Sequence, residues 1–147
     1  MDNNEENRRN KLKEFIKIMH ESITGYNLNN NIRSESDLDF IVYETIQIHK
    51  KNADLDYDEL FQKMGAFMMY EIATKHPFWD GNKRTALIIY LFYSHSGTNI
   101  NLLAEKYMSW FKNWDTRDDE IVNFMLNTAA GKYNYNVFLT KLKGIFK

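Results

Sequence analysis

The sequence predicts one small domain with almost no net charge. It has 147 residues, of which 44% are hydrophobic and 15% aromatic, and its formal net charge is −1. That length suits a single domain with a sizeable core. A near-zero charge provides no strong field for nucleic acid or an anionic membrane, so we expect neither as a main partner. The lack of cysteine excludes a disulfide framework and a zinc–thiolate site, and it favours a cytoplasmic location.

Hydrophobic residues recur at three- and four-residue spacings along most of the chain, which predicts an all-α fold. We expect residues 1–8 to form a flexible polar tail and residues 9–147 a single domain. The first predicted helix covers residues 9–22 and is followed by a loop over residues 25–33. The second is capped by Ser34 or Ser36, and the third begins at Asp56 or Asp58 and ends near Lys75. Four more are predicted over residues 82–96, 103–113, 118–130 and 135–146, with an extended segment at residues 98–102.

The helix over residues 82–96 has no polar side in its middle, which is typical of a buried central helix. The stretch before it, HPFWDGNK, is highly polar and contains the chain's only proline, Pro77. Proline disfavours helix at the preceding residue, so it ends the third helix there. A polar loop therefore leads into the first turn of the most buried helix.

This loop has the features of an anion-binding site. Unpaired N–H groups and the helix dipole attract anions to a helix N-terminus, and Gly81 can adopt the positive φ that lets a phosphate approach. Lys83 and Arg84 place two cations in the first turn, where each costs about 0.3–1 kcal/mol unless an anion is present. The pattern suggests a polyphosphate ligand.

Three further residues complete a set suited to phosphate chemistry. Asp80 offers a hard oxygen ligand for Mg²⁺, His76 can accept a proton near neutral pH, and Phe78 can anchor the loop in the core. Each alone is typical of an ordinary loop, but together within nine residues they favour transfer of a phosphate-containing group to a hydroxyl. His20 and His49 have no metal-ligand spacing, so we expect ordinary helix-face residues, and the P-loop pattern is not met.

The segment HPFWDGNKRTA resembles the signature loop of the Fic/Doc (Fido) superfamily, whose general form is HPFx(D/E)GNGRxxR. The stretches NIR with SESDLDFIVYE, DELFQKMGAFMMYEIATKHPF and NTAAGKYNYNVFLTKLK are similar to the flanking helices of Doc-type members. The likeness covers about residues 10–145 and is poorest near residues 101–117. It implies a compact bundle of about six to seven helices around a central buried helix.

The resemblance also implies roles for the loop residues. The implied catalytic residues are His76, which deprotonates the target hydroxyl, Asp80, which binds Mg²⁺, and Arg84, which holds the nucleotide phosphate. The implied nucleotide-binding set is Phe78 as the buried anchor, Gly81, Asn82, Lys83 and Arg84. ATP and Mg²⁺ are the implied cofactors.

Two departures from the nucleotidyl-transferring pattern point to the Doc (death-on-curing) branch. Lys83 replaces the second glycine, and Leu87 replaces the final arginine. The resemblance then implies a toxin kinase that transfers the γ-phosphate of ATP to a threonine of elongation factor Tu and arrests translation. A Fic-type AMP or NMP transferase (protein AMPylation) and a catalytically silent Fido binding module are the alternatives.

Relatives are often silenced by an [S/T]xxxE[G/N] motif on the same chain or on an antitoxin. The nearest match is TRDDE at residues 116–120, but Ile121 stands in the last position, and the pattern also resembles a helix N-terminal cap. We interpret it as a chance match. A separate antitoxin protein is therefore expected as a partner, beside the protein substrate.

Overall fold

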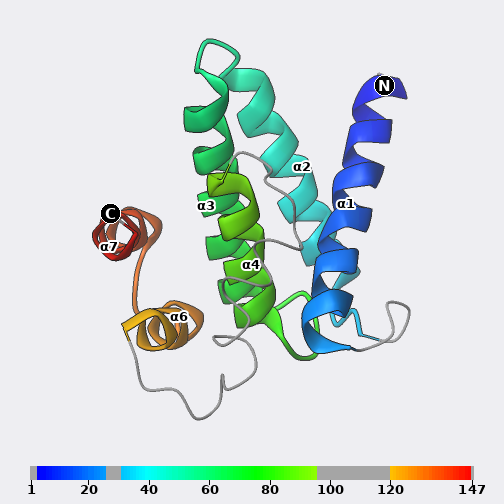
Figure 1. Cartoon of the computed structure of the whole chain (residues 1–147). Helices are drawn as coiled ribbons and strands as arrows, with labels where there is room; N and C mark the ends of the chain where they lie inside the picture. The colour runs from blue at the N-terminus through cyan, green and yellow to red at the C-terminus, as the bar shows by residue number, and fades with distance from the viewer. Residues whose placement is uncertain (1–2, 26–30, 96–119, 147) are drawn as a thin grey trace.

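The computed structural model describes residues 3–25, 31–95 and 120–146, and within these ranges it is all-α, as predicted (Figure 1). The predicted helix over residues 103–113, the extended segment and the start of the helix at residue 118 lie outside them. An isolated antiparallel bridge joins Ile32 and Phe78. The helices are α1 (Asn3–Thr24), α2 (Glu35–Lys51), α3 (Tyr57–Lys75), α4 (Asn82–Ser94), α6 (Glu120–Ala129) and α7 (Tyr135–Ile145).

The first helix begins at Asn3 and not at Arg9, so the prediction of a tail over residues 1–8 is wrong from Asn3 onward. Its first turn is held against α2, because Glu5 accepts hydrogen bonds from Gln47 Nε2 at 2.9 Å and Lys50 Nζ at 3.3 Å. A polar turn needs such a tertiary partner to stay helical. That partner is 42 residues away along the chain, so local sequence did not reveal it.

Side-chain caps settle the predicted helix starts. Ser34 caps α2 by accepting from Asp37 N, and Asp56 caps α3 by accepting from Glu59 N at 2.8 Å. Each cap satisfies one of the amides that a helix N-terminus leaves without an intrahelical partner. Of the two candidates at each position, the first in the chain is therefore the one used.

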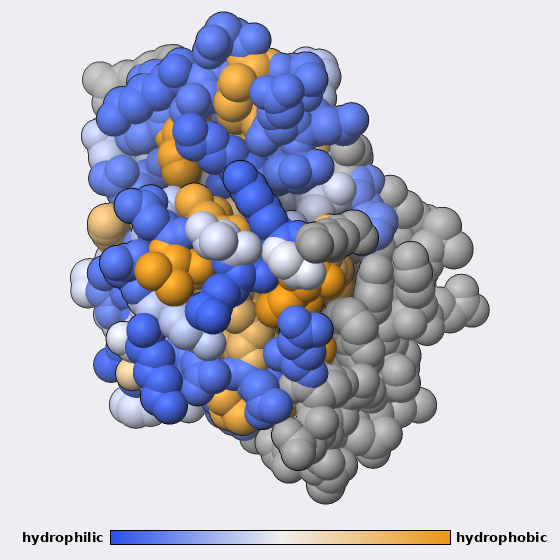
Figure 2. Space-filling model, turned by 90° about the vertical axis from the view of Figure 1, so that its left-hand side faces the viewer, coloured by the Kyte–Doolittle hydropathy of each residue, from blue (hydrophilic) through white to orange (hydrophobic). Residues whose placement is uncertain are grey.

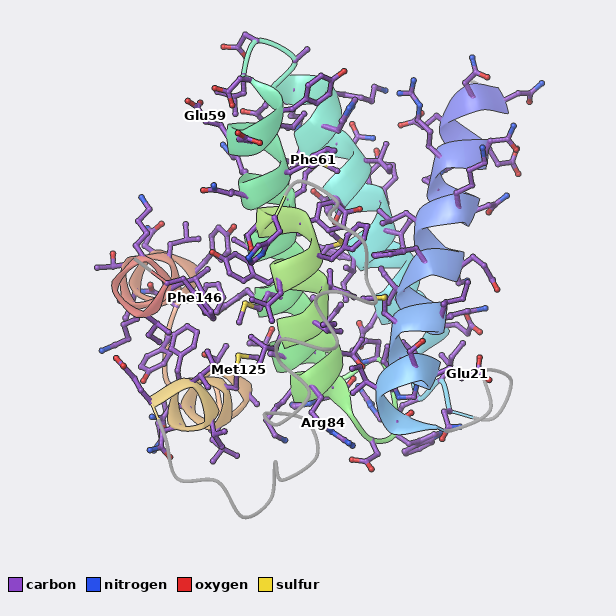
Figure 3. The ribbon with its side chains drawn as sticks, in the orientation of Figure 1. Glu21, Glu59, Phe61, Arg84, Met125 and Phe146 are labelled. Carbon is purple, nitrogen blue, oxygen red and sulfur yellow. The ribbon has the colours of Figure 1, made fainter. Side chains whose placement is uncertain are left out.

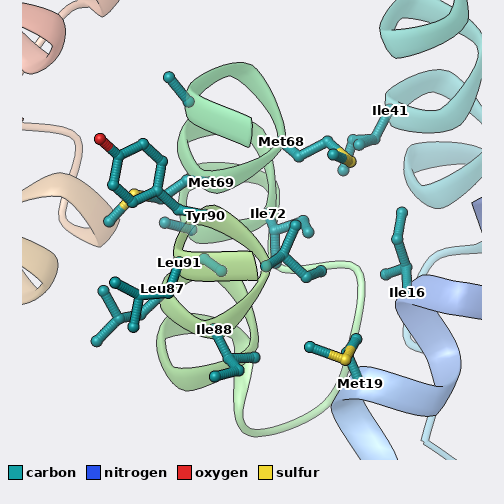
Figure 4. Close-up of a cluster of buried hydrophobic side chains, with 14 of the residues drawn as sticks. Ile16, Met19, Ile41, Met68, Met69, Ile72, Leu87, Ile88, Tyr90 and Leu91 are labelled. Carbon is teal, nitrogen blue, oxygen red and sulfur yellow. The ribbon is translucent and has the colours of Figure 1, made fainter. Parts of the chain in front are cut away.

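The fourth helix is the central helix, as predicted. It runs antiparallel to α3, with α1 and α2 on one side and α6 and α7 on the other (Figure 1). Close approach of α3 and α4 depends on Gly65, since a Cβ there would lie 2.7 Å from Tyr93 Cβ. The core takes side chains from all six described helices, and Figure 4 shows Leu87 and Leu91 of α4 among them.

On the side of α6 and α7, hydrophilic side chains surround separate hydrophobic patches (Figure 2). One cavity of about 420 Å³ lies between α3, α4 and α7, and another of about 450 Å³ lies between α6 and α7. Their linings include no residue of the polar loop. None of the described helices has the length and apolar character needed to cross a membrane.

We predict that truncating Leu87 to alanine lowers the free energy of unfolding by about 2–5 kcal/mol, because its side chain is fully buried on the central helix. The matched control is Leu126→Ala on α6, whose side chain is 47% exposed and whose loss should cost no more than about 0.5 kcal/mol. Urea unfolding measures both. Equal losses for the two variants would show that α4 is not the central packing element.

Candidate active site

The candidate site is the loop of residues 76–81, between the end of α3 and the start of α4. Its first residue, His76, is the C-cap of α3 and has left-handed backbone angles, φ 54° and ψ 60°. Among the described residues, no other non-glycine residue has a positive φ. This conformation costs a residue with a Cβ about 1–2 kcal/mol, so surrounding contacts must hold it in place.

Arg33 provides the main contacts. Its Nε donates to the His76 carbonyl at 2.6 Å, and its Nη2 donates to the Lys75 carbonyl at 2.7 Å. These are carbonyls at the end of α3, where the negative end of the helix dipole favours a cation. A planar guanidinium can serve both at once. The two hydrogen bonds from Arg33 therefore hold the backbone of His76 in place.

The backbone around Arg33 also holds the loop. The N–H groups of Arg33 and Ser34 donate to the Pro77 carbonyl at 2.7 and 3.0 Å, and Trp79 N–H donates to the Asn31 carbonyl at 3.0 Å. Residues 31–34 thus run along one side of the loop. They limit its movement without covering Trp79, whose side chain is 67% exposed.

Phe78 of the loop and Asn82, the first residue of α4, face inward. Phe78 is only 2% exposed, and Asn82 is buried beneath the loop. Asn82 Oδ1 accepts from Phe78 N–H at 3.0 Å, while its Nδ2 donates to the Phe78 carbonyl at 2.8 Å. Both polar atoms of the Asn82 side chain are therefore used to close the loop. Any contact of Asn82 with an anion falls to its backbone amide.

Gly81 forms the corner at the start of α4. It has φ 78° and leaves the helix without a side-chain cap, and a Cβ there would collide with the Thr24 methyl group. Its N–H donates to Asp80 Oδ1 at 2.8 Å. The Asp80 carboxylate therefore accepts a hydrogen bond from an amide that we expected to bind a phosphate.

The two cations of the first turn have different surroundings. Arg84 lies at the loop end of α4 (Figure 3), with its Nη2 3.9 Å from Asp80 Oδ2. Asp80 thus offsets one of the two positive charges that are unfavourable at a helix N-terminus. Lys83 has no ion-pair partner among residues 3–25, 31–95 and 120–146.

The His76 imidazole is suited to accept a proton. Burial lowers its pKa, and the positive charges of Lys83 and Arg33 lower it further, while a hydrogen bond with the Ala129 backbone works in the opposite direction. The net effect is a pKa below the ordinary value, and in the neutral ring one of the two nitrogens carries the lone pair that can accept a proton. At neutral pH the ring is therefore neutral.

A family model described as the Fic/DOC family matches residues 10–94, which include most of α1 and everything from α2 to α4. The chain belongs to the Fic/DOC family. Proteins of this family generally transfer a nucleotide or a phosphate group to other proteins, using a nucleoside triphosphate with Mg²⁺. Neither the comparison with curated proteins nor that with solved structures finds a match.

The Fic/DOC loop gathers the predicted site residues at one end of the bundle, but they divide into two groups. His76, Asp80, Lys83 and Arg84 are exposed or half-buried. Phe78, Gly81 and Asn82 are buried and shape the loop. The contacts of the second group support the loop itself, and the proposed roles of all these residues in binding or catalysis remain predictions.

The donor set is compatible with Mg²⁺ at Asp80. In the described part of the chain, no group of three or more His, Cys, Asp or Glu could hold a metal by itself. Magnesium is usually bound by one or two carboxylates together with water and substrate phosphates. The Asp80 side chain is 61% exposed beside the amides of α4, so it could bind an ion carried in with a nucleotide.

Sequence reasoning missed two residues of this site. In the sequence, Arg33 stands out only as part of the stretch NIR, which resembles Doc-type members. In the structure it holds the backbone of His76. His20 was expected on an ordinary helix face, but it is buried against the loop and its Nε2 lies 2.7 Å from the Asp80 carbonyl oxygen. Both contacts join residues more than forty positions apart. No local pattern signals them.

We predict that Arg33→Ala lowers the free energy of unfolding by roughly 1–2 kcal/mol, through loss of two hydrogen bonds to helix-end carbonyls, and releases His76 from its left-handed conformation. Urea unfolding and the backbone chemical shifts of His76 measure the two effects. Arg33→Lys should retain only part of the stability that Arg33→Ala loses, because an ammonium group lacks the planar pair of N–H donors of a guanidinium. Arg8→Ala, at an exposed position of α1, controls for the lost charge. Unchanged His76 shifts in Arg33→Ala would contradict the assignment.

We predict that the His76 imidazole titrates below the ordinary histidine pKa of about 6.5, because burial and neighbouring cations disfavour its charged form. As the pH falls through that lowered pKa, His76 gains a proton and can no longer act as a base. NMR titration of the ring measures the midpoint directly. Lys83→Gln removes one repelling charge and should raise the midpoint. A wild-type midpoint above the ordinary value would refute the prediction.

Proposed function

We propose that the protein is a Doc-like protein kinase that transfers the γ-phosphate of ATP to a hydroxyl group of a protein target. The observation that carries this proposal is the position of His76. Burial and the positive charge of Lys83, in the first turn of α4, lower the pKa of its ring, and the loop that begins at His76 leads directly into the N-terminus of that helix. A base, a cation without a described ion-pair partner and a helix N-terminus together suit transfer from a phosphate chain to a hydroxyl.

In the proposed reaction the target hydroxyl oxygen attacks the γ-phosphorus. The bond between the γ-phosphorus and the β–γ bridging oxygen breaks, and ADP leaves. The hydroxyl proton passes to the nitrogen of His76 that carries the lone pair. Arg84 and Lys83 balance the charge of the phosphate chain. Mg²⁺, bound through Asp80 and the phosphates, would neutralise charge that develops on the phosphate oxygens.

The kinase reading is favoured over AMP transfer by two positions. Leu87 stands where the nucleotidyl-transferring pattern has its final arginine, and it is fully buried in the core. The side chain at position 87 therefore offers no charge or hydrogen bond to a phosphate. Lys83 replaces a glycine and brings a positive charge near His76. These two changes to the anion-binding groups at the start of α4 should place a different phosphate of the nucleotide next to His76.

The remaining parts of the proposal rest on resemblance to Doc toxins. They are elongation factor Tu as the target, arrest of translation, a cytoplasmic site of action and a separate antitoxin. The TRDDE segment begins outside the described residues, so its interpretation as a chance match remains a prediction. The balanced charge of the chain supports protein over nucleic acid as the partner.

We predict that the purified protein labels elongation factor Tu, alone or in a cell lysate, from ATP labelled at the γ position and not from ATP labelled at the α position. The reason is that the altered loop seats the terminal phosphate beside His76. Autoradiography after electrophoresis measures the transfer. His76→Ala is the control and should abolish labelling while its helical circular dichroism remains.

Each alternative has its own result in this assay. Label that arrives only from the α position would replace the kinase with an AMP transferase. Folded wild-type protein that transfers neither label, with any growth arrest unchanged in His76→Ala, would support a silent binding module. Transfer of γ label to a lysate protein other than elongation factor Tu would keep the kinase and reject the target.

A further inference from the structure

His20 connects the end of α1 to the candidate site. Its side chain is 1% exposed, and its ring stacks on Phe78 with the centroids 3.9 Å apart and the planes at 13°. Its Nε2 lies 2.7 Å from the Asp80 carbonyl oxygen, across 60 residues of sequence. Figure 1 shows this end of α1 beside the loop that precedes α4.

The chemistry of this contact fixes the state of the ring. A carbonyl oxygen can only accept, so Nε2 must carry the proton and Nδ1 must carry the lone pair. Nδ1 is buried and has no hydrogen-bond partner among the described residues. Burial also lowers the pKa of His20, which keeps the ring neutral. A buried unpaired nitrogen destabilises the fold, and an apolar ring could make the same stack without it.

The bond to Asp80 has a geometric consequence for Gly81. In a trans peptide the carbonyl and the following N–H point in opposite directions. When His20 holds the Asp80 carbonyl toward α1, the N–H of Gly81 must point away from α1, and there it meets Asp80 Oδ1 at 2.8 Å. Thr24 packs against Gly81 from the same helix and leaves no room for a Cβ. The end of α1 thus determines where this amide points.

We propose that His20 is a positioning residue that orients the Asp80–Gly81 peptide, so that the Gly81 amide and the Asp80 carboxylate both face an incoming phosphate chain. Its ring touches neither the nucleotide nor the target hydroxyl. The part that concerns phosphate binding rests on the proposed function, while the orientation of the peptide does not. The competing explanation is that His20 is only a core side chain that packs on Phe78.

Two substitutions separate the ring from its hydrogen bond. His20→Phe keeps a ring for the stack on Phe78 but removes the donor. His20→Gln loses the ring but places an amide N–H near the position of Nε2. If His20 positions the peptide, the Gly81 amide resonance should shift or broaden in His20→Phe and stay near its wild-type position in His20→Gln. If it only packs, the two variants should show the reverse order.

The first measurement is NMR of the full-length protein, which needs no activity. Ring nitrogen shifts of wild-type His20 should show the Nε2–H tautomer, and the Gly81 amide is followed in both variants. An Nδ1–H tautomer in the wild type, or an unchanged Gly81 resonance in His20→Phe, would overturn the proposal. The tautomer is read in the wild type, so this result stands even if His20→Phe does not fold.

The second measurement is calorimetric titration with ATP in the presence of Mg²⁺. Affinity should fall about tenfold in His20→Phe, equivalent to the loss of one hydrogen bond, and should be largely retained in His20→Gln. A shifted Gly81 amide with unchanged ATP affinity would reject the role of this peptide in phosphate binding. A folded wild-type protein that binds no ATP would refute the proposed function. The NMR measurement would still test whether His20 orients the Asp80–Gly81 peptide.

Discussion

The site depends on the pairing of Arg33 with the carbonyl end of α3. A histidine in left-handed backbone conformation is unfavourable by itself, and two hydrogen bonds from one guanidinium hold the carbonyls of Lys75 and His76 where that conformation places them. The cation also lies at the negative end of the helix dipole. One side chain therefore compensates the strain and binds the carbonyls at the end of the helix, and its charge adds to burial and to Lys83 in lowering the pKa of the His76 imidazole.

The inward-facing and outward-facing residues of the site have separate roles. Phe78 and Asn82 are buried, and their mutual hydrogen bonds close the loop over the core. The Asp80 carboxylate is largely exposed and the Lys83 side chain is half-buried. The exposed groups lie on or next to α4, which is packed in the core. Catalytic groups carried on a packed element hold their geometry better than groups on a free loop.

Asp80 contacts two of the groups expected to bind an anion. Asp80 accepts from the Gly81 amide and lies 3.9 Å from Arg84. This internal carboxylate offsets the charge of a cation at a helix N-terminus. A bound phosphate chain would take over the same amide and guanidinium, which would free the carboxylate for a metal ion. Binding of phosphate and of metal would then be coupled through one side chain.

Much of this protein is determined by local sequence. Hydrophobic spacing, cap residues and Pro77 predicted the described helices, and the polar loop before the buried helix pointed to the family and to His76, Asp80 and Arg84. The helical start at Asn3, the two hydrogen bonds from Arg33 and the burial of His20 were decided only by the tertiary structure. Periodicity and caps record contacts within a few residues of the chain, whereas these features arise from partners forty to sixty residues away.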